Sequence, residues 1–230
     1  MQSERPITSR GEPDAAALAG LDDIDPLLAR LYAMRGVTES AHVDYGLGGL
    51  APVGALEHID DAVDLLLANR EERIIVVGDF DVDGATSTAL MLRCLRAFGF
   101  SDVDYLVPNR FEFGYGLSPE IVEVAAQRNP ELIVTVDNGI SSAPGVDAAR
   151  NAGISVLITD HHLPGTDIPD ADVIVNPNLE GSAFPSGNLA GIGVAFYLMA
   201  ALGRMLESGG QEGAAKLPAR YLDLVALGTV

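Results

Sequence analysis

The chain has 230 residues, of which 48% are hydrophobic, and a formal net charge of −19 at pH 7. This length and apolar content can bury a full core as one large domain or a domain and a half. No apolar run reaches the roughly 18–20 residues needed to cross a bilayer, and the amino terminus lacks the order of a signal peptide. The lone cysteine, Cys94, excludes an internal disulfide framework and fits a reducing compartment. We therefore expect a cytoplasmic protein with no membrane partner.

The acidity limits how the chain can meet nucleic acid. There are 33 acidic and 14 basic residues, and Lys216 is the only lysine. Over most of its surface such a chain repels a polyanion. A polyanionic substrate would therefore have to be held by metal ions and a few local arginines. The acid excess fits either a salt-adapted host or missing basic partner domains.

The first 70 residues are predicted to be a helical lead-in. Residues 1 to about 20 are polar and Ala-rich. The segment from Asp25 to Arg35 predicts a short helix, with Pro26 early in it and Gly36 behind it. The segment 45–52 predicts a loop. Apolar spacing over 58–69 then predicts an amphipathic helix that leads into the first strand.

From about residue 71 apolar runs alternate with helical spacing. Strands are predicted at 74–78, 103–107, 132–136, 154–158 and 172–175. Helices are predicted at about 84–98, from 118 onward, near 144–151, at 190–206 and at 217–227. The strands are continuous apolar runs, which is typical of parallel strands covered on both faces. The sequence therefore predicts an α/β fold, with a doubly wound, mainly parallel sheet and helices on both faces.

Polar side chains follow four of these strands. In strand order they are Asp79, Asp81 and Asp83, then Asn109 and Arg110, then Asp137 and Asn138, then Asp160, His161 and His162. Ligands of open parallel sheets bind outside the carboxyl ends of the strands, so we expect these groups to converge. Carboxylates with imidazole suit Mn²⁺ or Mg²⁺. The number of ligands indicates two ions that share a carboxylate.

Other kinds of site share parts of this pattern. The series Asp-x-Asp-x-Asp-Gly also opens an EF-hand loop, but that loop needs Glu at its twelfth position, here Leu90, and a helix in front. A phosphoryl-accepting receiver domain also gathers aspartates at strand ends, but it does not need the histidines of 160–162. Gly191-Ile-Gly193 lacks the preceding strand and the third glycine of a dinucleotide loop. We interpret it as close helix packing.

Three segments resemble the first three motifs of the DHH phosphoesterases: Gly78-Asp-Phe-Asp-Val-Asp-Gly84, Val136-Asp-Asn-Gly-Ile140 and Asp160-His-His162. Other segments resemble the branch of that family that degrades single-stranded DNA from 5′ ends: Tyr105-Leu-Val-Pro-Asn-Arg-Phe, Gly114-Tyr-Gly-Leu-Ser-Pro, Ile174-Val-Asn-Pro-Asn, Leu189-Ala-Gly-Ile-Gly-Val-Ala-Phe and Leu222-Asp-Leu-Val-Ala-Leu-Gly-Thr-Val230. The likeness runs from about Leu31 to the end of the chain. It implies a metal-dependent 5′→3′ exonuclease of recombination and repair, with a helicase and a single-strand-binding protein as partners of the parent enzyme.

The resemblance also implies a role for each matched residue. The metal ligands are expected to be Asp79, Asp81, Asp83, Asp137 and His161, with Asp137 bridging two ions. His162 is expected to contact the scissile phosphate, and Asp160 to orient a histidine. We expect Asn109, Arg110 and Asn138 to contact phosphate or DNA, because a guanidinium such as that of Arg110 can fork onto phosphate oxygens.

The sequence departs from the family pattern at two places. Many members have a histidine where this chain has Val77, and the fourth motif continues beyond Val230 with Ala-Asp. We therefore expect 71–230 to be a DHH core truncated before its fourth motif, and the isolated chain to be impaired. Two alternatives remain: a DHH phosphodiesterase that acts on short oligoribonucleotides or cyclic dinucleotides, and an inactive DHH-fold scaffold.

Overall fold

The computed structural model describes residues 11–109 and 114–230. The chain divides into two compact units, Met1–Leu50 and Ala51–Val230. The sequence places the boundary near residue 70, about twenty residues later. The second unit begins earlier because helix α3 (Ile59–Ala68) buries apolar side chains, Ile59, Val63 and Leu66 among them, in the same core as the sheet.

The described part of the first unit, residues 11–50, contains two short helices and a small core. They are α1 (Ala15–Ala19) and α2 (Pro26–Ala33), and the 3₁₀ turns η1 (Ser40–Val43) and η2 (Leu47–Gly49) follow. The Asp25 carboxylate accepts hydrogen bonds from the first N–H groups of α2, and Pro26 stands at its first position. The predicted helix after Asp25 is thereby confirmed. The buried apolar residues of this unit are Ala17, Leu21, Ala29 and Ala33.

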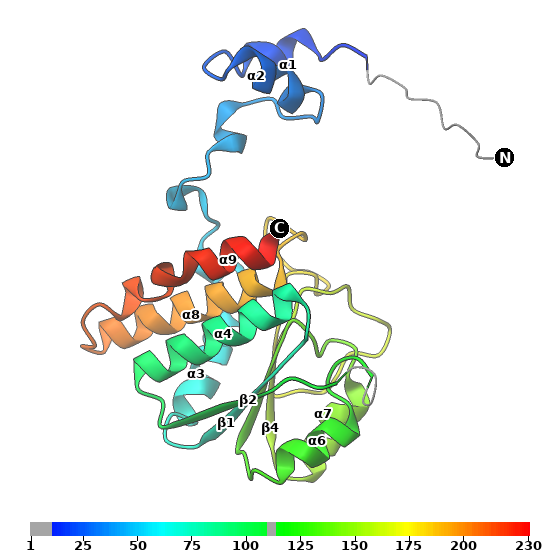
Figure 1. Cartoon of the computed structure of the whole chain (residues 1–230), viewed down its shortest axis with the longest axis vertical. Coiled ribbons are helices and arrows are strands. Elements are labelled where there is room, and N and C mark those ends of the chain that lie inside the picture. Colours follow the sequence, from blue (N-terminus) through cyan, green and yellow to red (C-terminus); the bar gives the residue numbers. More distant parts are fainter. Residues whose placement is uncertain (1–10, 110–113) are drawn as a thin grey trace, which may run out of the picture. The chain divides into compact units, whose positions relative to one another are not determined.

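The second unit is built on a five-stranded parallel sheet in the order β2-β1-β3-β4-β5. Figure 1 labels β1, β2 and β4 of this sheet. The strands are β1 (Arg73–Gly78), β2 (Asp102–Leu106), β3 (Leu132–Val136), β4 (Ser155–Thr159) and β5 (Val173–Val175). Each lies within about a residue of its predicted position. The chain runs outward from β1 to β2 and then resumes on the other side of β1. The point where the strand order reverses therefore lies between β1 and β3, where doubly wound sheets bind ligands.

Helices cover both faces of this sheet, as predicted. On one face lie α3, α4 (Val82–Phe98) and α8 (Gly191–Ser208), while α6 (Pro119–Ala126) and α7 (Ala143–Asn151) lie on the other (Figure 1). Successive side chains of a strand point to opposite faces. Accordingly, Ile74 and Val76 of β1 enter the larger core, and Ile75 and Val77 enter the smaller one. The α/β, doubly wound fold is confirmed.

The carboxyl-terminal segment differs from the single helix predicted over 217–227. It forms the 3₁₀ turns η4 (Ala214–Lys216) and η5 (Pro218–Tyr221), followed by α9 (Leu222–Thr229). Proline begins η5, and the backbone at Tyr221 leaves helical geometry at φ −115° and ψ 25° before α9 begins. A further turn, η3 (Val53–Ala55), precedes α3. Within 11–109 and 114–230, no helix combines the length and the apolar character required to cross a membrane.

The core at α4 makes a testable prediction about its thiol. Cys94 is fully buried, and burial raises the pKa of its thiol to about 12. Because the thiolate is the reactive form, a disulfide reagent should modify Cys94 at least about a hundredfold more slowly in the native chain than in guanidinium. The release of thiol-reagent chromophore measures both rates. Modification of the native chain as fast as that of the denatured chain would contradict this packing.

Candidate metal centre

The sheet register brings the predicted site residues to one edge. The last paired row runs through Gly78, Val136, Thr159 and Val175. The residues that follow this row are Asp79, Asp137, Asp160 and Asn176. Backbone pairing continues past the strands, since the N–H of Asp137 donates to the Thr159 carbonyl at 3.0 Å. Side chains from these four strand ends therefore lie next to one another. Asp79, Asp137 and Asp160 were expected to converge, whereas Asn176 was not assigned from the sequence.

Among the residues that the structure describes, two groups of side chains at this edge could hold cations. One comprises Asp79, Asp81 and Asp137, and the other comprises Asp137, His161 and His162; within each, one ligand atom per residue lies within 4.8 Å of the others. Asp137 belongs to both. Carboxylate oxygens with imidazole nitrogens form a donor set suited to Mn²⁺ or Mg²⁺. The shared carboxylate is the position from which one residue could bridge two ions.

Asp137 is held in an unfavourable state. The residue is 2% exposed, and its backbone lies in the left-handed region at φ 61°. Its Oδ1 atom is 3.0 Å from His161 Nε2, in a geometry that does not form a hydrogen bond, and it accepts none from the described residues. Burial raises the pKa of Asp137 to about 6. A buried carboxylate oxygen without a hydrogen-bond donor fits a cation site.

The close approach of helix α8 confines this oxygen further. Gly191 begins α8, and a Cβ atom on it would lie 2.5 Å from Asp137 Oδ1. Any other residue would push the carboxylate aside. The short Gly191-Ile-Gly193 segment thus serves close packing, as predicted, and the packing partner is the central residue of the site.

Asp160 is fully satisfied by neighbouring donors. Its Oδ1 accepts hydrogen bonds from the backbone N–H of His161 at 2.7 Å and of His162 at 3.1 Å, and it lies 2.7 Å from His162 Nδ1. Its Oδ2 accepts from the N–H of Ile140 at 2.9 Å. Burial alone would raise the pKa of Asp160, but these hydrogen bonds outweigh burial and lower it. Asp160 is therefore placed to orient His162.

The two histidines are each paired with a carboxylate. His161 Nε2 lies 3.0 Å from Asp137 Oδ1 and 3.6 Å from Asp83 Oδ2. Contact with Asp137 raises the pKa of His161, and the hydrogen bond with Asp160 raises the pKa of His162. Each imidazole therefore lies beside carboxylates, Asp137 and Asp83 for His161 and Asp160 for His162, at the same edge of the sheet.

Three further residues support the histidines and were not assigned from the sequence. Asn176 Nδ2 donates to the His162 carbonyl at 3.0 Å, and Asn178 Nδ2 donates to the His161 carbonyl at 2.6 Å. The hydroxyl of Tyr115 lies 3.3 Å from His162 Nδ1. Burial and the nearby carboxylates raise the pKa of Tyr115 above its usual range, so its hydroxyl stays protonated. The position of the two asparagines just after the last strand was the available signal.

Asp83, which was predicted to be a metal ligand, also caps helix α8. Its Oδ2 accepts a hydrogen bond from Gly191 N at 2.7 Å, and its Oδ1 accepts one from Ile192 N at 2.6 Å. Ala190, the residue just before helix α8, offers no capping side chain, so Asp83 supplies the cap. Neither candidate cation group includes Asp83. Its role as a direct ligand stays a prediction.

The remaining predicted residues lie in varied surroundings. Asn138 is 1% exposed, and its Nδ2 donates to the carbonyls of Val77 and Val136, so its amide ties β1 to β3 and is not available to a phosphate. Asn109 is exposed just after β2, and Arg110 lies outside the described residues. Val77, at the position of the family histidine, is fully buried among apolar side chains beneath α6 and α7.

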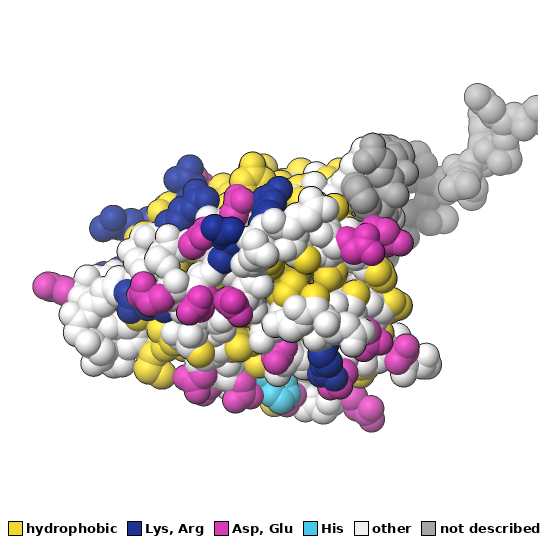
Figure 2. Space-filling view, turned by 90° about the horizontal axis from the view of Figure 1, so that it is seen from below, with side chains coloured by type: hydrophobic (Ala, Val, Ile, Leu, Met, Phe, Trp, Pro, Cys, Tyr) yellow, Lys and Arg dark blue, Asp and Glu magenta, His cyan; other side chains and the backbone are white. Residues whose placement is uncertain are grey.

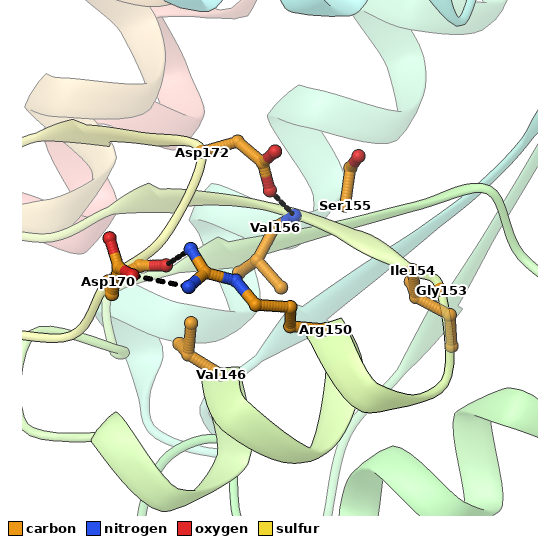
Figure 3. Close-up of a pocket in the computed structure, with 8 residues that line it drawn as sticks. All are labelled: Val146, Arg150, Gly153, Ile154, Ser155, Val156, Asp170 and Asp172. Atoms are coloured by element: carbon orange, nitrogen blue, oxygen red, sulfur yellow. Dashed lines mark hydrogen bonds and ion pairs between the residues drawn. The ribbon is translucent and has the colours of Figure 1, made fainter.

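A cavity of about 220 Å³ lies at the opposite end of the sheet (Figure 3). It is beside Ser155, the first residue of β4. Its charged groups are already paired, because Arg150 bonds to Asp170 and Asp172 accepts a hydrogen bond from Val156 N at 2.8 Å. Because these charged groups already bond within the cavity, the strand-end site is the stronger candidate. On the face shown in Figure 2, acidic side chains are spread widely and most basic side chains gather on one side.

Comparisons with known proteins agree with this geometry. Residues 73–229 match a family model described as the DHH family, N-terminal domain. The chain is 52% identical over 236 residues to the single-stranded-DNA-specific exonuclease RecJ of Salmonella typhimurium, covering all of this chain and 41% of the relative. It is 56% identical over 214 residues to the RecJ of Escherichia coli, covering 90% of this chain and 37% of the relative. The chain thus spans about two fifths of the curated relatives' length.

Solved structures that match this chain also include RecJ exonucleases. A crystal structure of RecJ from Thermus thermophilus in complex with Mn²⁺ matches with a TM-score of 0.73 and 32% identity, over 94% of this chain and 29% of that one. A crystal structure of exonuclease RecJ bound to manganese matches with a TM-score of 0.67 and 36% identity, over 78% of this chain and 44% of that one.

The strain on Asp137 predicts a stability effect in the metal-free chain. At pH 7 a buried carboxylate with a raised pKa destabilises the folded state, so Asp137→Asn should raise the free energy of unfolding by about 1–3 kcal/mol. Asparagine also tolerates the left-handed backbone. Below about pH 4 the carboxyl is protonated in both states, so the difference should shrink as the pH falls. Urea unfolding at both pH values measures it. A variant less stable than the parent at pH 7 would contradict this account.

The cap on α8 predicts the opposite sign for Asp83. Asp83→Ala leaves two backbone N–H groups at the start of a buried helix without their acceptor, and we expect the free energy of unfolding to fall by about 1–2 kcal/mol. Asp167→Ala, at an exposed aspartate outside the site, is the control and should have no measurable effect. Equal stability of the two variants in urea would show that Asp83 does not cap α8.

Proposed function

The chain belongs to the DHH family, and from that premise we propose that it is the catalytic core of a metal-dependent phosphodiesterase. The observation that carries the proposal is Asp137, a buried carboxylate common to both groups that could hold a cation. Two divalent cations, Mn²⁺ or Mg²⁺, are the proposed cofactors, in keeping with the manganese named for the similar RecJ structures. Residues 71–230 are the proposed DHH core and 1–70 its helical lead-in.

The side chains divide the work of hydrolysis between them. Asp79, Asp81, Asp137 and His161 would hold the cations, and Asp83 would add a ligand from the start of α4. When bound, the cations would lower the pKa of a water and neutralise phosphate oxygens. Asp160 fixes the Nδ1 side of His162, and this leaves Nε2 to donate a hydrogen bond to the scissile phosphate. Asn176 and Asn178 hold the backbone of both histidines in place.

The proposed substrate is single-stranded DNA, degraded from the 5′ end in recombination and repair. Its support is the likeness to proteins named single-stranded-DNA-specific exonuclease RecJ. With a net charge of −19, the chain must concentrate its attraction for phosphate at the cation site and at nearby groups such as Asn109 and Arg110. A helicase and a single-strand-binding protein are proposed partners of the native protein. We place it in the cytoplasm, where its lone thiol would stay reduced.

The first test is hydrolysis by the native protein that carries this chain. With Mn²⁺ it should shorten 5′-labelled single-stranded DNA and release labelled mononucleotides, while duplex DNA of the same sequence should stay intact. Asp137→Asn removes the charge shared by both groups, so we expect at least about a thousandfold loss of rate. The matched control is Asp170→Asn, an exposed aspartate at the other end of the sheet, which should keep full activity.

Other outcomes decide between the remaining functions. Preference for short oligoribonucleotides or cyclic dinucleotides over long DNA would replace the exonuclease with a small-substrate phosphodiesterase. Absence of hydrolysis together with absence of Mn²⁺ binding would identify a scaffold. Full activity of Asp137→Asn would refute the shared carboxylate.

A further inference from the structure

We propose that Tyr115 is a positioning residue that fixes Asp137 and His162 relative to each other for the reaction. The inference deepens the proposed function and rests on it. Tyr115 precedes α6 in a loop that the sequence analysis left without a role. Its hydroxyl reaches residues that follow two different strands, β3 and β4.

The hydroxyl of Tyr115 touches both partners. It donates a hydrogen bond to the backbone carbonyl of Asp137 at 3.1 Å. It also lies 3.3 Å from Nδ1 and 3.4 Å from Nε2 of His162. The two rings meet edge to face, with centroids 5.8 Å apart and planes at 75°. One oxygen atom therefore contacts both the backbone of Asp137, the central residue of the site, and the imidazole of His162.

Each partner has a reason to need this contact. The left-handed backbone of Asp137 is uncommon for a residue with a side chain, and the Tyr115 hydroxyl donates to its carbonyl and so helps to hold this conformation. His162 is about half exposed and is fixed at Nδ1 by Asp160. A second contact on the ring from Tyr115 limits its rotation about that hydrogen bond.

The loop that carries Tyr115 is anchored at its far end. Leu117 is 1% exposed, and its N–H donates to Ser142 Oγ at 3.0 Å. Its carbonyl lies so close to Gly145 of α7 that a Cβ atom there would be 1.8 Å away. Because α7 follows β3 directly, the loop is tied to the same strand connection that carries Asp137. The packing of Leu117, two residues after Tyr115, thus holds this part of the loop and positions the hydroxyl.

The test uses Tyr115→Phe, which removes the hydroxyl and keeps the ring. The chain has four histidines, so a two-dimensional ¹H–¹⁵N spectrum contains few imidazole signals, and the change at His162 can be followed separately. His42 and His58 lie outside the site and serve as internal references. In the metal-free chain we expect the ring-nitrogen signals of His162 to shift, and those of His42 and His58 to stay unchanged. The matched control is Tyr105→Phe, at an exposed tyrosine on β2, which should shift none of them.

Kinetics of the native protein give the second readout. Loss of one hydrogen bond that orients reacting groups should lower kcat for single-stranded DNA by about three- to tenfold. KM should stay within about twofold, because Tyr115 is not proposed to hold the substrate. Tyr105→Phe should keep both constants. Circular dichroism checks that both variants are folded.

Two results would overturn the proposal: His162 signals identical to those of the parent chain, or an unchanged kcat in folded Tyr115→Phe. The spectrum does not depend on catalysis. If the parent protein cleaves no DNA, the proposed function fails, and a shifted His162 signal still supports the contact. If DNA is cleaved and the signal does not move, the proposed function stands and the role of Tyr115 falls.

Discussion

The structure depends on how it tolerates several carboxylates at one edge of a sheet. Neighbouring carboxylates repel one another, and burial adds a desolvation cost for Asp79, Asp137 and Asp160. The chain answers with backbone N–H groups: Asp79 accepts one from Phe80, Asp81 one from Gly84, Asp83 two from the start of α8, and Asp160 three. Asp137 Oδ1 is the exception, since it accepts no hydrogen bond from the described residues. This oxygen faces the imidazole of His161 and lies where the two candidate cation groups overlap.

The acidic edge of the sheet is also the edge at which two helices, α4 and α8, have their amino termini, with Asp81 and Asp83 at their first turns. A helix amino terminus carries partial positive charge and unpaired N–H groups, so both helices stabilise the acidic edge. The glycine that opens α8 lets this end approach Asp137 closely. The packing of the larger core and the charge state of the site are therefore coupled.

Much of the fold followed from local patterns. Continuous apolar runs identified the strands, and polar residues just after them identified the edge where they converge, because parallel strands end together. Contacts between distant segments could not be read in this way. The hydrogen bonds that the start of α8 donates to Asp83 cross 108 and 109 positions of sequence. The burial of Asn138, the contact of Tyr115 with His162 and the early start of the second unit likewise depend on packing that no short segment encodes.

Family resemblance added roles, and geometry adds constraints on them. Asp137 has the features expected of a bridging ligand, whereas both oxygens of Asp83 already accept helix N–H groups. The most direct test of the shared carboxylate is a Mn²⁺ titration of the native protein followed by electron paramagnetic resonance. The account predicts that two ions bind and that the second produces the spectrum of a magnetically coupled pair. A single bound ion, or two ions with independent spectra, would contradict it.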